Sequence, residues 1–101
     1  TFATSRKGSV LSVDLNTRKI EPYLKKGLEV GNLEGIAKVG KDYYITDWMS
    51  GLLLRVSKTG FETVVSGLKN PTDPNYAEEL GIIAVPEHGT NRVLFIKLPK
   101  Q

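Results

Sequence analysis

The sequence predicts an all-β fold made of a unit that recurs about every 40 residues. Apolar residues alternate with a period of two in short runs, and turns rich in Gly, Ser and Lys separate these runs. The stretch "YYITDWMSGLLLRVSK" also has weaker copies before and after it. A helical period does not fit these segments. We therefore expect short antiparallel strands along the whole chain.

The repeated units align at fixed offsets. An offset of 43 relates the first unit to the second, and an offset of 40 relates the second to the third. In each unit the third strand has two apolar residues on one alternating face; in chain order they are Leu11 and Val13, Leu54 and Val56, and Leu94 and Ile96. An apolar face that recurs in every unit is expected to pack in a core, so we expect these six side chains to be buried between sheets.

The expected strands fall into three groups. Residues 1–26 hold the end of one unit, with strands at 2–4, 9–15 and 19–25. Residues 33–66 hold a complete unit, with strands at 33–39, 42–47, 52–58 and 61–66. Residues 71–99 hold three strands of the next unit, at 74–78, 81–86 and 92–98. Four antiparallel strands in about 40 residues are typical of a β-propeller blade.

The strand count amounts to about two and a half blades, whereas propellers usually close with about four to eight. We therefore expect a fragment of a longer propeller, completed by the remaining blades of the same protein or by other copies of the chain. The third strand of the last unit, near residues 93–96, should present an unpaired edge that residues outside these 101 cover. The alternative is an independent small sandwich of two sheets.

Blade topology predicts where functional side chains gather. The innermost strand begins, and the second strand ends, on the same face of a propeller. Six residues occupy these positions: Glu34 and Asp73 at the starts of inner strands, Asp47 and Glu87 at the ends of second strands, and Trp48 and His88 directly after them. We therefore expect four carboxylates, the one indole and the one imidazole on a common face.

Glu34 and Asp73 are candidate metal ligands. Hard cations such as Ca²⁺ take six to eight oxygen ligands, and a channel mouth allows each blade to contribute one. A bound ion could then polarise a carbonyl group or activate water. The alternative is that each carboxylate caps a turn through nearby backbone amides.

Asp47, Trp48, Glu87 and His88 are candidate ligand-binding residues. Trp48 offers a stacking surface, and His88 is a candidate general base because histidine exchanges a proton near neutral pH. The alternatives are solvated loop carboxylates, a tryptophan packed on the neighbouring blade and an ordinary loop histidine.

Composition and charge limit the kinds of partner and site that the chain can have. The net charge is +3, but Lys and Arg occur as pairs at turns rather than as one stripe, so we do not expect nucleic-acid binding. Cysteine is absent, which excludes disulfides and thiolate metal sites. No apolar run approaches the roughly 20 residues of a membrane span. The residues themselves do not determine the compartment.

Two segments carry a family resemblance. "LEGIAKVGKDYYITDWMSGLLLRVSKTG" and "LKNPTDPNYAEELGIIAVPEHGTNRVLFIKL" resemble the C-terminal blades of the NHL and senescence-marker-protein/gluconolactonase-like six-bladed propellers. In that superfamily "P-x-G-I" or "P-x-D-I" opens the innermost strand, and "N-R-V" follows the loop after the second. Here "LEGI" and "NRV" stand at these places.

The resemblance implies one of two functions. One branch holds Ca²⁺-dependent lactonases or esterase-like hydrolases, whose ion ligands match Glu34 and Asp73, although Pro74 replaces the expected aliphatic residue. The other branch holds non-catalytic interaction discs. We expect a scaffold that binds a small molecule or a protein, with no complete active site in this chain; the alternative is a fragment of a Ca²⁺-dependent hydrolase. The resemblance also implies a secreted or periplasmic location.

Overall fold

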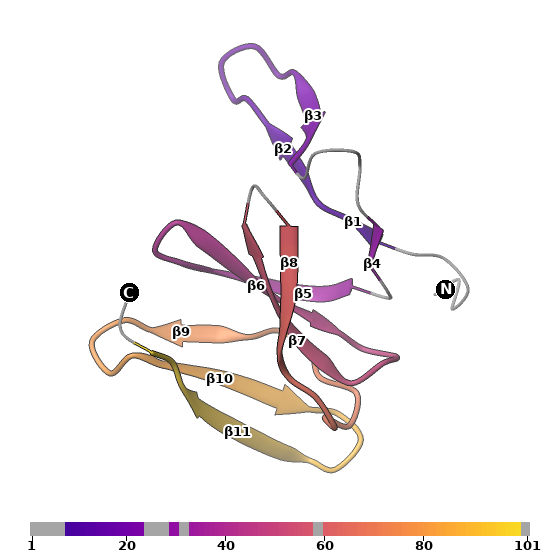
Figure 1. Ribbon diagram of the computed structural model, residues 1–101, viewed down its shortest axis with the longest axis vertical. Helices are drawn as coiled ribbons and strands as arrows, with labels where there is room; N and C mark the ends of the chain where they lie inside the picture. The colour runs from indigo at the N-terminus through magenta and orange to yellow at the C-terminus, as the bar shows by residue number, and fades with distance from the viewer. Residues whose placement is uncertain (1–7, 24–28, 31–32, 58–59, 100–101) are drawn as a thin grey trace.

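The computed structural model describes residues 8–23, 29–30, 33–57 and 60–99, and this part of the chain forms antiparallel sheets without any helix (Figure 1). The predicted all-β fold is confirmed. Within the same residues, accordingly, there is no helix of the length and hydropathy that crossing a membrane requires.

The central sheet has four strands in the order β5-β6-β7-β8. The strands are β5 (Leu33–Val39), β6 (Asp42–Asp47), β7 (Leu52–Ser57) and β8 (Gly60–Val65). Each boundary lies within one residue of the expected strand of the complete unit. Gly40 begins the turn between β5 and β6 and Gly51 ends the turn between β6 and β7, with φ values of 62° and 70°, a conformation that glycine adopts without steric cost.

The C-terminal sheet has three strands in the order β11-β10-β9. They are β9 (Asn75–Ala77), β10 (Ile82–Glu87) and β11 (Arg92–Lys97), as the third group of expected strands indicates. β11 lies at the edge of this sheet, and no described strand pairs with its outer side. The expected open edge is therefore found in the described part of the chain.

The two sheets share an irregularity that supports the repeat. In each, the pairing of the first two strands slips by one residue near the start of the first strand. The pairs that bracket the slip are Leu33 with Asp47 and Ile36 with Ile45 in the central sheet, and Pro71 with Glu87 and Asn75 with Ala84 in the C-terminal region. When the two sheets are superimposed through these pairs, Asp73 takes the position of Gly35. The sequence alignment had instead placed Asp73 at the position of Glu34, one residue away.

The main core lies between these two sheets. Its buried members are Val39, Tyr44, Leu53, Leu68, Ile83, Val85 and Leu98. Leu94 and Ile96 of β11 pack against this core and are partly buried. A second, smaller cluster on the other face of the central sheet combines Ile45 and Val56 with other partly buried residues.

The N-terminal part forms a projecting hairpin in place of a packed blade (Figure 1). Its strands are β1 (Gly8–Ser9), β2 (Leu11–Val13), β3 (Ile20–Pro22) and β4 (Glu29–Val30); β2 pairs with β3, and β1 pairs with β4. The expected strand at 2–4 lies outside the described residues. Val10 and Tyr23, which flank the hairpin, contact the smaller core cluster.

The expectation of six buried side chains holds for the central sheet and fails for the hairpin. Leu54 and Val56 are 2% and 0% exposed, as predicted. The prediction was wrong for Leu11 and Val13, which are 56% and 52% exposed. Alternation assigns residues to a face, but burial also needs a neighbouring sheet, and no described element covers this face of the hairpin.

Candidate functional site

Two matching turns follow β6 and β10. The amide of Gly51 donates to the carbonyl of Asp47 at 3.0 Å, and the amide of Asn91 donates to the carbonyl of Glu87 at 3.1 Å. Gly51 and Asn91 both have positive φ, 70° and 57°. These four residues correspond at the offset of 40, so the sequence repeat is also a repeat of backbone geometry.

Asp47 and Glu87 hold these turns with their side chains. Oδ1 of Asp47 accepts a hydrogen bond from the amide of Ser50 at 3.0 Å, and Oε1 of Glu87 accepts one from the hydroxyl of Thr90 at 2.7 Å. Both carboxylates belong to residues that are only 2% exposed. The interpretation as solvated loop carboxylates is therefore wrong, and both side chains contribute to the shape of the turns.

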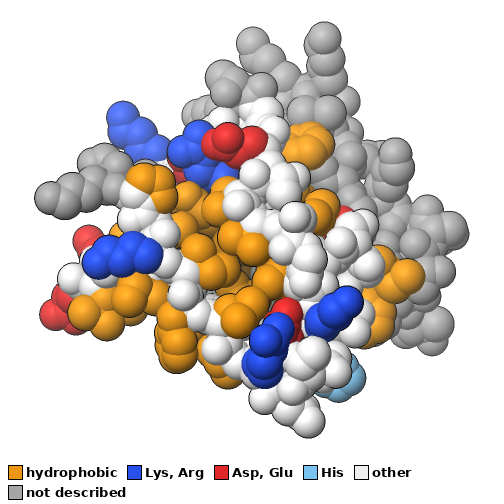
Figure 2. All heavy atoms as spheres, turned by 60° about the horizontal axis from the view of Figure 1, so that its bottom comes forward, with side chains coloured by type: hydrophobic (Ala, Val, Ile, Leu, Met, Phe, Trp, Pro, Cys, Tyr) orange, Lys and Arg blue, Asp and Glu red, His pale blue; other side chains and the backbone are white. Residues whose placement is uncertain are grey.

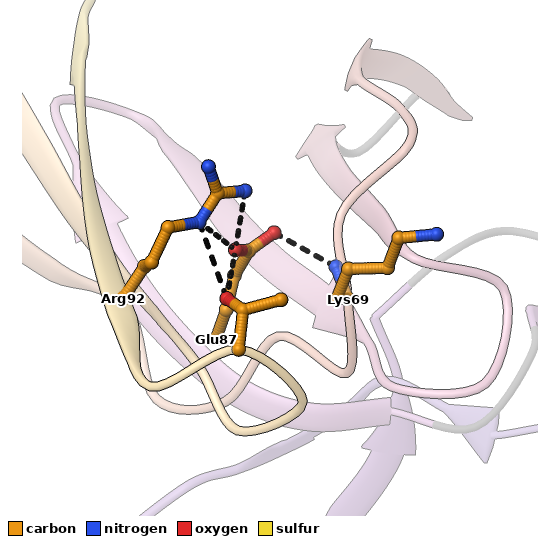
Figure 3. Close-up of polar contacts among 4 residues, drawn as sticks. Lys69, Glu87 and Arg92 are labelled. Carbon is orange, nitrogen blue, oxygen red and sulfur yellow. Dashed lines mark hydrogen bonds and ion pairs between the residues drawn. The ribbon is translucent and has the colours of Figure 1, made fainter.

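Glu87 lies at the centre of a polar network (Figure 3). Its Oε2 accepts a hydrogen bond from the amide of Lys69 at 2.8 Å, and its Oε1 forms an ion pair with Arg92 at 2.8 Å. The hydrogen bond from Thr90, the amide of Lys69 and the charge of Arg92 outweigh the effect of burial, so the pKa of Glu87 is lowered to about 2. The carboxylate is thus ionised under ordinary conditions and ties β10 and β11 to the segment before β9.

This network predicts an acid-dependent stability difference for Glu87→Gln. Because the folded pKa is lowered from 4.5 to about 2, ionised Glu87 stabilises the fold above about pH 4.5, and the contribution is lost as the pH falls through about 2. The wild type should therefore unfold at higher urea than the variant near pH 6, and the two midpoints should converge between about pH 4.5 and 2. A separation that stays constant down to pH 2 would contradict this role.

Asn70 lies between the two turns and joins them. Its Nδ2 donates to the carbonyl of Trp48 at 3.3 Å, and its own carbonyl accepts from the amide of His88 at 2.9 Å. Asn70 has a φ of 52°, a conformation that asparagine tolerates better than most residues. We call residues 47–51, 68–70 and 87–91 the turn surface. It brings together the backbones of Trp48 and His88, with Trp48 half-buried and His88 exposed.

Glu34 is the second residue of β5, and Asp73 lies two residues before β9, at the same end of the sheets. The side chain of each residue is exposed. A β-carbon on Gly35 would lie 2.6 Å from Cα of Asp73, a backbone atom, so this position requires glycine. The buried hydroxyl of Thr46 accepts from the amide of Gly35 at 3.1 Å and donates to the carbonyl of Thr72 at 3.0 Å, which ties the two inner strands together.

The structure therefore places the six predicted residues at one end of the two sheets. Four of them, Asp47, Trp48, Glu87 and His88, belong to the turn surface. Glu34 and Asp73 stand at the adjacent strand starts, since Leu33 pairs with Asp47 and Pro71 bridges to Glu87. In the described part of the chain, no group of three or more Asp, Glu or His side chains is arranged to hold a metal ion. The Ca²⁺ site stays a prediction.

Asn70 and Arg92 are parts of this end that the sequence did not predict. The dipeptide Asn70-Pro71 was a usable signal, because Asn before Pro favours a turn. The ion pair between Arg92 and Glu87 had a weaker signal, since the two residues flank a four-residue turn between adjacent strands.

A hollow lies at the opposite end, around the β5–β6 turn. It has a volume of about 620 Å³ and is lined by Tyr23, Lys38, Gly40, Lys41, Asp42, Tyr43 and Ser57. The rings of Tyr23 and Tyr43 meet edge to face, with centroids 5.4 Å apart. This hollow is open and separate from the turn surface.

Comparison of the chain with protein-family models, with curated proteins and with solved structures finds no match.

Proposed function

We propose that this chain is a section of a β-propeller and acts as a scaffold that binds a ligand or a protein at the turn surface. One observation carries the proposal: two equivalent turns on adjacent sheets are fixed by the buried carboxylates of Asp47 and Glu87 and joined by Asn70. Loops held rigidly at one end of a sheet scaffold are common binding sites.

The accessible chemistry of the turn surface favours an acidic peptide with apolar side chains. Because Asp47 and Glu87 are buried, Lys69 supplies the exposed charge of the turn surface itself, while the exposed residues Glu34 and Asp73 lie outside it at the adjacent strand starts. Figure 2 shows Lys and Arg side chains near the histidine. Met49, which is 50% exposed, and Trp48 supply apolar area. Met, Trp and Arg are enriched at protein interfaces.

Fluorescence of Trp48 tests this proposal, because the chain has one tryptophan. Peptides selected from a random displayed library against the full chain should be rich in Asp, Glu and aliphatic residues, and should change the Trp48 emission saturably. Lys69→Glu should weaken their binding by about tenfold or more, a loss of about 1.4 kcal/mol. Lys41→Glu, at the opposite end of the sheet, is the matched control and should have little effect. Selected peptides that bind without any effect of Lys69→Glu would contradict the proposal.

The second candidate is a fragment of a Ca²⁺-dependent lactonase. It is favoured by one observation, the placement of the exposed residues Glu34 and Asp73 at adjacent strand starts on either side of Gly35. Millimolar Ca²⁺ should then raise the melting temperature, because an ion that binds the native state stabilises it. A rise that Glu34→Gln abolishes, together with lactone turnover, would replace the scaffold proposal with the hydrolase.

A further inference from the structure

The segment between β8 and β9 is anchored on both sides of Asn70, where it crosses the turn surface. Leu68 is 7% exposed and belongs to the main core, and its amide donates to the carbonyl of Gly51 at 3.0 Å. Pro71 is also buried, and it bridges to the end of β10. Because close-packed residues hold both sides of this short segment, Asn70 has little freedom to move relative to the two sheets.

Asn70 contacts both turns, and it does so with different atoms. Its Nδ2 donates to the carbonyl of Trp48 in the β6–β7 turn at 3.3 Å, and its carbonyl oxygen accepts from the amide of His88 in the β10–β11 turn at 2.9 Å. Its Oδ1 lies against Gly89, since a β-carbon on that glycine would be only 2.9 Å away from this oxygen. The side chain of Asn70 therefore lies between the backbones of the two turns.

Few residues could replace asparagine at this position. The φ of Asn70 is 52°, in the left-handed region that glycine, asparagine and aspartate tolerate best. Of these three, only asparagine can donate a side-chain hydrogen bond to a carbonyl oxygen, because ionised aspartate only accepts and glycine has no side chain. The backbone conformation and the bond to Trp48 together therefore favour asparagine.

We propose that Asn70 is the positioning residue of the turn surface and makes one binding site of two turns that would otherwise move independently. Its side-chain amide fixes the backbone at Trp48 relative to the β10–β11 turn. A ligand that contacts both turns then meets them already arranged, which lowers the cost of ordering them on binding. The inference rests on the proposed binding function, but the position of Trp48 can be measured without any ligand.

Acrylamide quenching of Trp48 fluorescence in the free 101-residue chain tests the positioning. Asn70→Gly keeps a residue that suits positive φ and removes only the side chain, so the β6–β7 turn should loosen and quenching should increase. Asn91→Gly is the matched control, because Asn91 also has positive φ, 57°, and its backbone amide bonds within its own turn. This variant should be quenched like the wild type. Unchanged quenching in Asn70→Gly would overturn the proposal.

Far-UV circular dichroism checks that each variant is folded. Asn70→Asp replaces Asn70→Gly if the latter does not fold, because aspartate keeps the size of the side chain and tolerates positive φ but lacks the donor. The expected increase in Trp48 quenching is the same.

Gly89→Ala shows whether Asn70 transmits a change from one turn to the other. The new β-carbon would lie 2.9 Å from Oδ1 of Asn70 and must displace that side chain. The substitution is in the β10–β11 turn, yet it should increase the quenching of Trp48 in the β6–β7 turn. In the Asn70→Gly background it should have no further effect. Equal increases in the two backgrounds would mean that the change reaches Trp48 by another route, and would overturn the role of Asn70.

Peptide binding, measured by titration calorimetry, separates the positioning role from the binding function. Acidic peptides selected against the wild type should bind Asn70→Gly about fivefold more weakly, a loss of about 1 kcal/mol, as expected for one hydrogen bond. They should bind Asn91→Gly like the wild type. Unchanged affinity of Asn70→Gly for peptides that Lys69→Glu weakens would overturn the positioning role and leave the proposed function intact. Peptides that Lys69→Glu does not weaken would contradict the proposed function alone, because the quenching measurements decide the role of Asn70 without a ligand.

Discussion

Leu54→Ala should lower the free energy of unfolding by about 2–5 kcal/mol, the range for truncating a buried leucine. Leu54 lies in β7 and is 2% exposed. The substitution removes three side-chain carbon atoms from a site that neighbouring strands enclose, so both the buried apolar area and the packing around it are lost. Urea unfolding followed by the fluorescence of Trp48 gives the value directly.

Leu11→Ala is the matched control, because Leu11 corresponds to Leu54 in the repeat and is 56% exposed. The same chemical change should cost less than about 0.5 kcal/mol at a surface position. Equal losses for the two variants would contradict the exposure of the hairpin face.

The central unit could be predicted closely because local signals agree there. Strict alternation, β-branched and aromatic residues and turn glycines all indicate the same four strands between residues 33 and 66. The bounds of β5 to β8 consequently lie within one residue of the expected ones. The C-terminal sheet has the same agreement of signals over residues 75–97.

The β2–β3 hairpin shows that apolar alternation predicts strands but does not predict burial. Alternation predicted correctly that Leu11 and Val13 face the same way as one another, but it carries no information on whether a sheet lies opposite. Whether a side chain is buried depends on which other strands pack against its sheet. The offset between Glu34 and Asp73 failed by one residue because the turn between β9 and β10, residues 78–81, is two residues longer than the turn between β5 and β6, residues 40–41. The inner strands therefore correspond at an offset of 38, although the second strands correspond at 40.

The location of the candidate site could be predicted from blade topology, but the role of its carboxylates could not. Topology requires that the second strands end at the end where the first strands begin, which placed Asp47 and Glu87 correctly. Their burial depends on the segment 68–70, which lies against the turns and supplies the amide of Lys69 to Glu87. Contacts between segments this far apart in the sequence need the folded structure.

Gly51→Ala should destabilise the protein by about 2–5 kcal/mol, through backbone strain and a steric clash acting together. Gly51 is buried and has a φ of 70°, where an L-residue other than glycine is strained. A β-carbon at this position would also collide with the carbonyl oxygen of Leu68. That carbonyl belongs to the backbone, so relief of the clash would move the segment that carries Asn70.

Gly81→Ala separates the two causes. Gly81 has nearly the same backbone conformation, with a φ of 64°, but a β-carbon there would meet no atom within 4 Å. Its cost should be limited to the strain of the left-handed conformation, about 1–2 kcal/mol. The difference between the variants then measures how tightly the segment before β9 packs against the β6–β7 turn. Equal losses of stability for Gly51→Ala and Gly81→Ala would mean that the segment before β9 moves away from the new β-carbon without cost. The binding proposal requires this segment to be held rigidly, so that result would contradict it.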